Sequence, residues 1–262
     1  NWSSLQAARS GTMRTDLVLG IDIGGSSIKG GIVDVTKGSM YGERYVIGHQ
    51  QRPELETLVT SIFEIKKKSD FDGNNIGIGF PGVVSDREIF NGPNMGADLP
   101  GLGLCEYLSK LGQNSKLIND ADAALYHAMR NQPVWDGNPT VLLVTIGTSL
   151  GTALCQDGKM FRNLELGRLL DGSGKPIDTK ASMRAVRELD LGVEQWASNL
   201  SLSIRRISDC VSPDLILLGG GVTEEPDDWL DLLDVDHPIY IAPGSNAAGL
   251  IGAACWCFDN MK

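Results

Sequence analysis

Short apolar runs recur along this chain, and each is closed by Gly, Asn or Asp. Such runs predict buried strands at Leu17–Ile23, Ile28–Val35, Ile76–Phe80, Lys116–Ile118, Val141–Ile146, Thr152–Gln156 and Leu215–Leu218. Apolar positions spaced three and four apart predict helices at Glu54–Lys67, Ala121–Met129, Glu194–Cys210 and Ala247–Phe258. Strands mixed with helices are typical of an α/β chain with partly parallel sheets.

A weak internal repeat suggests how these elements are organised. The segment GIDIGGSSIKGG, near residue 20, is echoed by the later segment LVTIGTSLGTAL. Both read as a strand, a Gly-rich turn and a second strand, and the alignment matches Asp22 with Thr145 and Gly24 with Gly147. Two similar halves, each opening with a Gly-rich hairpin, predict two lobes around a cleft.

The repeat also suggests domain boundaries. We expect an N-terminal lobe at residues 16–118 and a C-terminal lobe at 119–246, with the helix at 247–262 packing back on the first lobe. The segment at residues 1–15 has no apolar core typical of a signal peptide, and we expect a disordered tail or a cloning remnant there.

The first hairpin has the composition of a phosphate-binding loop. Glycine lets backbone N–H groups approach a ligand closely, and Ser26, Ser27 and Lys29 add side-chain donors. Asp22, an acid inside an apolar strand, is a natural partner for Mg²⁺ or its water shell beside a phosphate. A plain β-hairpin with a flexible turn is the alternative. Phosphate binding is favoured because the hairpin has an echo at Gly147, Thr148 and Gly151.

Two other glycine patterns fail their context tests. GIGFPG, residues 77–82, fits the dinucleotide pattern G-x-G-x-x-G, but no helix follows it and Pro81 stands where a helix should pack. GGSSIKGG is not a P-loop, because Lys29 is followed by Gly rather than Ser or Thr.

A candidate catalytic acid lies where a predicted strand gives way to a helix. Asp120 could simply cap that helix. It could instead be a general base, with Asn119 beside it to hold a substrate hydroxyl. Glu165 and Arg168 lie in a loop-like segment and could form no more than a weak ion pair.

A further glycine cluster ends the predicted strand at Leu215–Leu218. Gly219, Gly220 and Gly221 would let a flat or phosphorylated ligand approach, and a tight turn explains them equally well.

Composition narrows the partners. Among 262 residues, 23 Lys and Arg against 33 Asp and Glu give a net charge of −10, which argues against nucleic acid or an anionic membrane as main partner. No apolar run approaches the roughly 20 residues of a membrane span. Five cysteines suggest free thiols in a reducing cytoplasm, and three scattered histidines argue against histidine catalysis or a histidine zinc site.

One segment departs from this acidity. Residues 157–187 hold seven basic and four acidic side chains, a local balance of +3. A solvated mixed-charge surface explains it, and a track for a polyanion is the alternative.

In order along the chain, these motifs resemble the ROK family of sugar kinases, especially its polyphosphate- and ATP-using glucokinases. The resemblance rests on GIDIGGSSIKGGIVD, GIGFPGVV, NDADAA, VTIGTSLGTAL, ELGR, TKAS and LLGGGV, and covers about Leu17 to Phe258. It implies an actin/hexokinase-like, ribonuclease H-like fold: two lobes, a mixed sheet in each and a central cleft. The family's cysteine-rich zinc motif is missing, so no structural zinc is expected. We also expect a homodimer.

The resemblance also implies roles for individual residues. Asp120 would deprotonate the 6-hydroxyl of a hexose, and the donor would be ATP or polyphosphate with Mg²⁺. The sugar-binding residues would be Asn94, Asn119 and Glu165, with Arg168 beside them. The phosphate-binding residues would be Asp22, Gly24, Gly25, Ser26, Ser27, Lys29, Gly147, Thr148, Gly151, Gly219, Gly220 and Gly221.

One departure from the family concerns the substrate. The family has His after ELG, where it touches the sugar, and this chain has Arg168. Arginine is longer, always charged and unable to accept a hydrogen bond. The change is compatible with an altered sugar preference, or with an impaired protein that binds sugar or nucleotide as a sensor. An actin-like ATPase is a third alternative.

Overall fold

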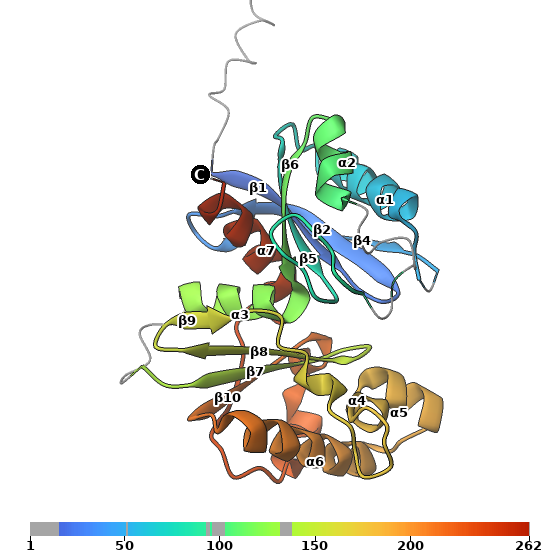
Figure 1. The fold of residues 1–262 in the computed structure, drawn as a ribbon, viewed down its shortest axis with the longest axis vertical. Helices are drawn as coiled ribbons and strands as arrows, with labels where there is room; N and C mark the ends of the chain where they lie inside the picture. The colour runs from blue at the N-terminus through green and yellow to red at the C-terminus, as the bar shows by residue number, and fades with distance from the viewer. Residues whose placement is uncertain (1–15, 51, 93–94, 96–102, 132–137, 262) are drawn as a thin grey trace, which may run out of the picture.

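The computed structural model describes residues 16–50, 52–92, 95, 103–131 and 138–261. In this part of the chain two mixed sheets lie one above the other (Figure 1). The first sheet has the order β3-β2-β1-β5-β6, with β4 also paired to β2. Its strands are β1 (Leu17–Ile23), β2 (Ser27–Asp34), β3 (Ser39–Met40), β4 (Tyr45–Gly48), β5 (Asn75–Phe80) and β6 (Asn114–Asn119).

The second sheet repeats the pattern of the first. Its order is β11-β10-β7-β8-β9. In each sheet an antiparallel hairpin, β1–β2 or β7–β8, continues into parallel neighbours, β5 and β6 or β10 and β11. The strands are β7 (Val141–Ile146), β8 (Leu150–Gln156), β9 (Lys159–Phe161), β10 (Leu215–Gly219) and β11 (Ile239–Ile241).

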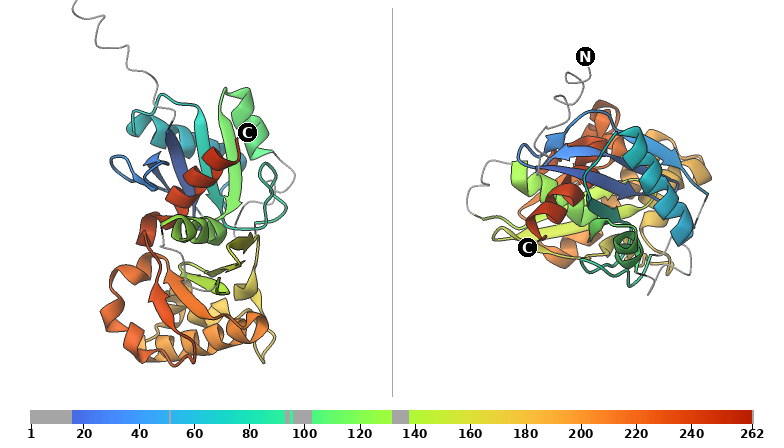
Figure 2. Two further views of the ribbon diagram at one scale, coloured as in Figure 1. Left: turned by 90° about the vertical axis from the view of Figure 1, so that its left-hand side faces the viewer. Right: turned by 90° about the horizontal axis from the view of Figure 1, so that it is seen from above.

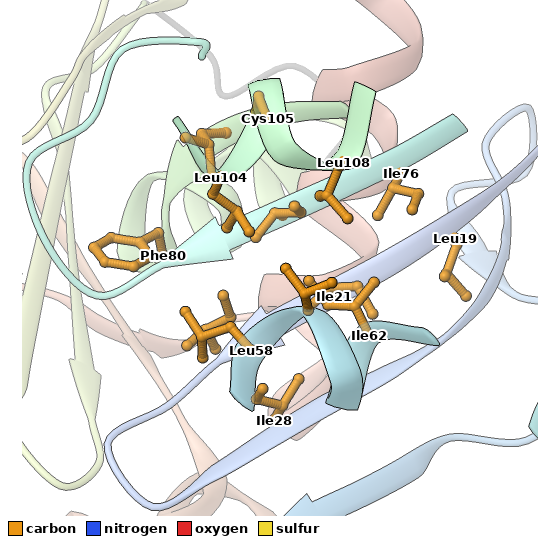
Figure 3. Packing of buried hydrophobic residues seen from close by; sticks show 14 of the residues in the cluster. Leu19, Ile21, Ile28, Leu58, Ile62, Ile76, Phe80, Leu104, Cys105 and Leu108 are labelled. Atoms are coloured by element: carbon orange, nitrogen blue, oxygen red, sulfur yellow. The ribbon is translucent and has the colours of Figure 1, made fainter. Parts of the chain in front are cut away.

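Helices cover both faces of the first sheet. The helices α1 (Leu55–Lys68) and α2 (Leu104–Lys110) pack their buried leucines and isoleucines on one face of β1 and β5 (Figure 3). The opposite face of β1 packs against α7 (Ala248–Asp259), through Val18, Leu250 and Ala254. Because side chains alternate along a strand, Val18 and Asp22 of β1 point toward α7.

The second sheet is also covered on both faces. Its inner face packs against α3 (Asp120–Asn131), which lies against α7 in the layer between the two sheets (Figures 1 and 2). The outer face packs against α6 (Val193–Val211), whose buried stripe includes Trp196, Leu200 and Ile204. Two short helices, α4 (Asp178–Ala181) and α5 (Met183–Leu189), lie beside α6.

Several glycines let α7 approach the sheet and α3 closely. A Cβ on Gly20 would overlap the carbonyl oxygen of Leu250, and one on Gly77 would overlap that of Ala253. The first glycine of GIGFPG therefore makes room for a helix, in agreement with the rejection of that motif as a dinucleotide loop. A Cβ on Gly252 would overlap the backbone of Ala123 in α3.

The strands and helices expected from the apolar pattern are all present, and their ends shift by at most two residues. The pattern missed the short elements β3, β4, β9, β11, α2, α4 and α5. The expected lobe boundary after residue 118 falls one residue before the end of β6. No helix among the described residues is long and apolar enough to cross a membrane.

Candidate active site

The carboxyl ends of the parallel strands meet at one edge of each sheet. In the first sheet, Asp22 of β1 is in register with Gly79 of β5, and Phe80 with Asn119 at the end of β6. In open α/β sheets ligands bind at this edge. The second sheet is arranged alike, since Gly219 of β10 is in register with Thr145 of β7.

A cleft of about 730 Å³ lies where these edges face each other. Most of the predicted site residues line it: Asp22, Gly24, Gly25, Ser26, Ser27, Lys29, Asp120, Gly147, Thr148, Gly151, Glu165, Arg168, Gly220 and Gly221. Asn119 and Gly219 are buried behind this lining. Asn94 lies outside the described residues.

The first loop is a tight turn braced by a neighbouring segment. The N–H of Gly24 donates to Ser27 O at 2.9 Å. His49, just after β4, donates its backbone N–H to Ser26 O at 3.0 Å, and its ring Nε2 lies 3.0 Å from Gly24 O. The other ring nitrogen, Nδ1, lies 2.7 Å from Gln50 O. The turn is thus held in one shape before a ligand binds.

The second loop faces the first. The N–H of Gly147 donates to Ser149 O at 3.0 Å, and Gly147 O accepts from the N–H of Met183 at 2.8 Å, which ties the loop to α5. A Cβ on Gly25 would lie 3.5 Å from Cγ2 of Thr148. Without side chains at Gly24 and Gly25, the two loops can approach each other closely.

Asp22 is the acid of the first loop. It stands beside Gly249 of α7 and opposite Lys29 in the β1–β2 register. Lys29 Nζ lies 3.9 Å from Asp22 Oδ2, and 18% of the Asp22 side chain is exposed. Burial raises the pKa of Asp22, against the lowering effect of the Lys29 and Arg44 charges. A cation bound nearby would stabilise the ionised form of this carboxylate.

Asp120 faces the cleft at the first turn of α3. Asn119 caps this helix, because its Oδ1 accepts from the N–H groups of Ala121 and Asp122 at 2.9 and 3.0 Å. Asp120 Oδ1 shares the Ala121 N–H at 2.8 Å. The cap expected at Asp120 is therefore provided chiefly by its neighbour. Burial first, and then the negative charges of Asp22 and Glu165, raise the pKa of Asp120 well above its ordinary value.

Asn119 and Glu165 form a connected pair. Asn119 Nδ2 donates to Glu165 Oε1 and to Gly82 O, each at 3.1 Å. With both amide hydrogens donated and Oδ1 accepting two bonds, a sugar hydroxyl would have to displace one of these partners. Burial raises the pKa of Glu165, while the charge of Arg168 and the bond from Asn119 lower it. Arg168 thus acts electrostatically on Glu165 across the cleft lining.

The basic segment divides between the cleft and the surface. Arg184 and Arg187 of α5 line the cleft, and Arg184 Nη2 lies 3.5 Å from Asp178 Oδ2. Lys180 is exposed and pairs with Asp171 at 2.7 Å. The composition of residues 157–187 signalled the charge, but α4 and α5 are too short for apolar periodicity to show which residues face inward.

One cleft residue had no signal in the sequence. Asn246, before α7, accepts a hydrogen bond from Lys29 at 3.4 Å and donates to Glu224 at 2.8 Å. It connects the first loop with the segment that follows Gly221.

We expect the contribution of Asp122 to the stability of the folded protein to fall as pH rises from 5 to 8. Burial raises the pKa of Asp122, on α3, to about 7, so in this range the folded state binds a proton that the unfolded state has released. Asp34, whose pKa is lowered to about 2, is ionised throughout and does not contribute to the slope. Thermal unfolding of the wild type and Asp122→Asn should show the variant gaining relative stability with pH. A constant difference would contradict this.

Two mixed sheets with paired glycine hairpins around a cleft define an actin/hexokinase-like chain. The model of the ROK family matches residues 18–165, more than half of the sequence. The chain belongs to the ROK family.

Named relatives agree with this assignment. The chain is 32% identical over 242 residues to a polyphosphate glucokinase of Mycobacterium tuberculosis (strain CDC 1551 / Oshkosh), covering 90% of this chain and 89% of that one. A polyphosphate glucokinase of Mycobacterium leprae (strain TN) is 30% identical over 247 residues, covering 94% and 76%.

Solved structures show the same fold. An inorganic polyphosphate/ATP-glucomannokinase from Arthrobacter sp. strain KM superposes with a TM-score of 0.86 at 32% identity, covering 92% of this chain and 98% of that one. A ROK family glucokinase from Streptomyces griseus, in complex with glucose and AMPPNP, gives a TM-score of 0.76 at 20% identity, covering 93% and 100%. At 20% identity, the similarity to the second structure is evidence for the fold alone.

Proposed function

We propose that this chain is a sugar kinase that transfers a phosphoryl group from polyphosphate or ATP to the 6-hydroxyl of a hexose, with glucose as the first candidate. The observation that carries the proposal is the position of Asp120 in a cleft lined by two facing glycine loops. Relatives at 30 to 32% identity, named polyphosphate glucokinases, support the reaction class.

Asp120 acts as the general base. Its raised pKa makes the ionised carboxylate a stronger proton acceptor, which suits a base that takes the proton of an alcohol as phosphoryl transfer proceeds. Glu165 and Arg168 bind sugar hydroxyls beside it, as acceptor and donor respectively. Asn94 and Asn119 complete the predicted sugar site, Asn119 chiefly by fixing Glu165.

The two loops hold the donor. Their backbone N–H groups, with the Ser26, Ser27 and Thr148 hydroxyls and the Lys29 ammonium, bind phosphoryl oxygens. Gly220 and Gly221 leave room for the rest of the donor, with Gly219 buried behind them. Aligning donor and acceptor in a cleft that excludes water favours transfer to the sugar over hydrolysis.

The cleft has the donor set for Mg²⁺. Asp22 and Asp120 are close enough for the charge of one to raise the pKa of the other, a repulsion that a cation relieves. No group of three or more His, Cys, Asp or Glu is placed to hold a metal in the described part of the chain. Asp22 would hold the ion, directly or through water, and the donor phosphates and water would complete its shell. The bound ion supplies positive charge against the charge on the transferred group.

The sensor alternative raised by Arg168 is not favoured, because the catalytic acid and both loops line one cleft and the relatives carry kinase names. The homodimer and the cytoplasmic location stay predictions.

A coupled assay tests the function. Glucose, mannose and N-acetylated hexoses are offered with ATP or polyphosphate and Mg²⁺, and sugar phosphate and ADP are both measured. We expect hexose 6-phosphate. Sugar binding without product would identify a sensor, and ADP release without any sugar would identify an ATPase; either result refutes the proposal.

A double substitution tests the donor track. Arg184→Gln/Arg187→Gln should raise the KM for polyphosphate about tenfold at low salt, because two partly exposed contacts of about 0.7 kcal/mol each are lost. The KM for ATP, a shorter anion, should change less than about threefold.

The matched control removes two charges far from the cleft, with Lys67→Gln/Lys68→Gln on exposed positions of α1. The idea of a polyanion track would be wrong if the arginine variant raised the KM for polyphosphate and for ATP equally. It would also be wrong if the arginine and lysine double variants changed the KM for polyphosphate equally.

A further inference from the structure

A side-chain amide joins the two sheets at the acceptor end of the cleft. Asn163 follows β9 of the second sheet, and Val84 follows β5 of the first. The N–H of Val84 donates to Asn163 Oδ1 at 3.0 Å, and Asn163 Nδ2 donates to Val84 O at 2.9 Å. One amide therefore pairs with both backbone groups of a residue in the opposite lobe, as a neighbouring strand would. We call this pair of bonds the Asn163 bridge.

The first-sheet side of the bridge is firmly held. Val84 forms a β-bridge with Ile89, and Asp86 O accepts from the N–H of Leu117 in β6 at 2.8 Å. Arg162, next to Asn163, donates to Asp86 Oδ1 at 2.7 Å. Its guanidinium lies 4.7 Å from the centre of the Trp256 ring on α7. The loop that receives Asn163 is thus fixed to β6, and Arg162 adds a second link across the lobes.

The second-sheet side is fixed by a buried acid. Asn163 has a φ of 61°, a left-handed conformation that asparagine tolerates better than most residues. Its backbone N–H donates to Asp122 Oδ2 at 2.7 Å, and Asp122 has no exposed surface. Asp122 belongs to the first turn of α3, beside Asp120. The orientation of the Asn163 amide is therefore tied to the helix that carries the proposed base.

The segment that forms the bridge also carries Glu165. Leu166 donates its N–H to Thr152 Oγ1 of β8 at 2.9 Å, and the Thr152 hydroxyl donates to Leu164 O. Between these anchors Glu165 reaches Asn119. Glu165 therefore lies two residues from Asn163, in a segment fixed to β8.

We propose that Asn163, oriented by Asp122, is a positioning residue for the acceptor sugar. The inference rests on the proposed sugar kinase function. The bridge sets the spacing of the lobes at the acceptor end and so fixes the Glu165 carboxylate relative to Asp120. At the donor end the lobes face each other at Gly25 and Thr148, two residues that take no part in the bridge.

Asn163→Gly isolates the bridge. Glycine adopts the left-handed backbone without strain, so the N–H to Asp122 is kept and only the two bonds to Val84 are lost. We expect the KM for the sugar to rise about tenfold, the effect of two hydrogen bonds of ordinary net strength. The KM for ATP and polyphosphate should stay within about twofold.

The matched control is Asn138→Gly, an exposed asparagine with a φ of 53° away from the cleft lining. It makes the same substitution in the same backbone conformation and should leave both KM values unchanged. A lower Tm for Asn163→Gly with an unchanged sugar KM would show a structural role only and overturn the proposal. A parallel rise in donor and sugar KM would overturn it too.

Calorimetry separates this inference from the proposed function. If the wild type binds glucose but transfers no phosphoryl group, the proposed function fails. The bridge is then judged on glucose binding alone. A Kd about tenfold weaker in Asn163→Gly supports positioning, and an equal Kd refutes it.

Discussion

Asp120→Asn should lower kcat by about 10²-fold or more and should leave glucose affinity within about threefold of the wild type. The amide has the shape of the carboxylate, and its oxygen can keep the hydrogen bond from the Ala121 N–H. It cannot take up the proton of the attacking hydroxyl. Steady-state kinetics with the better donor, together with glucose titration by calorimetry, measure the two quantities separately.

The same variant should be more thermally stable than the wild type. Burial and the charges of Asp22 and Glu165 disfavour the ionised form of Asp120, and asparagine removes that repulsion. The helix start keeps its cap at Asn119. Asp236→Asn, on an exposed residue, removes one negative charge elsewhere and controls for net charge. Near-normal turnover of Asp120→Asn would exclude Asp120 as the base, and an unfolded variant would contradict the proposed capping.

Gly252→Ala destabilises the protein through the contact between α7 and α3. A Cβ at this position overlaps the backbone of Ala123, which cannot move aside as a flexible side chain can. We expect the free energy of unfolding to fall by about 3 kcal/mol, the upper part of the range for overpacking. In a chain of this size the Tm falls by roughly 6 to 12 °C. Because Ala123 lies three residues after Asp120, kcat should fall as well.

The sign of this result is informative. In an exposed helix interior, alanine is more stable than glycine by about 1 kcal/mol. Without the close contact to α3, the substitution would therefore raise the Tm. Gly48→Ala is the matched control, since a Cβ there meets nothing within 4 Å. A Tm for Gly252→Ala at or above that of the wild type would mean that the two helices can separate freely.

The two loops could be predicted from the sequence because their signal is local. A strand, a Gly-rich turn and a second strand lie within about twenty consecutive residues, and the repeat places the same unit in each half. The apolar strand around Asp22 already indicated an acid at a buried edge. What the sequence could not separate were glycines that line the cleft, such as Gly25, from those that leave space for a helix, such as Gly20 and Gly77.

Contacts between distant segments gave no such signal. The Asn163 bridge joins residues 79 positions apart, and neither Asn163 nor Val84 stands in a distinctive local pattern. His49 braces Gly24 across 25 positions in the same way. The capping role of Asn119 had no signal for a related reason: adjacent residues at a strand-to-helix step can both cap, and only the geometry shows how they share the N–H groups.

The place of α7 has a consequence for synthesis on the ribosome. One face of β1 is covered by α7, while all of the second sheet lies between them in the chain. As translation proceeds from the N-terminus, Val18 and Val33 stay uncovered until Leu250 and Ala254 have left the exit tunnel. The nascent first half therefore exposes an apolar surface during elongation, and it can complete its fold only after the second half has emerged.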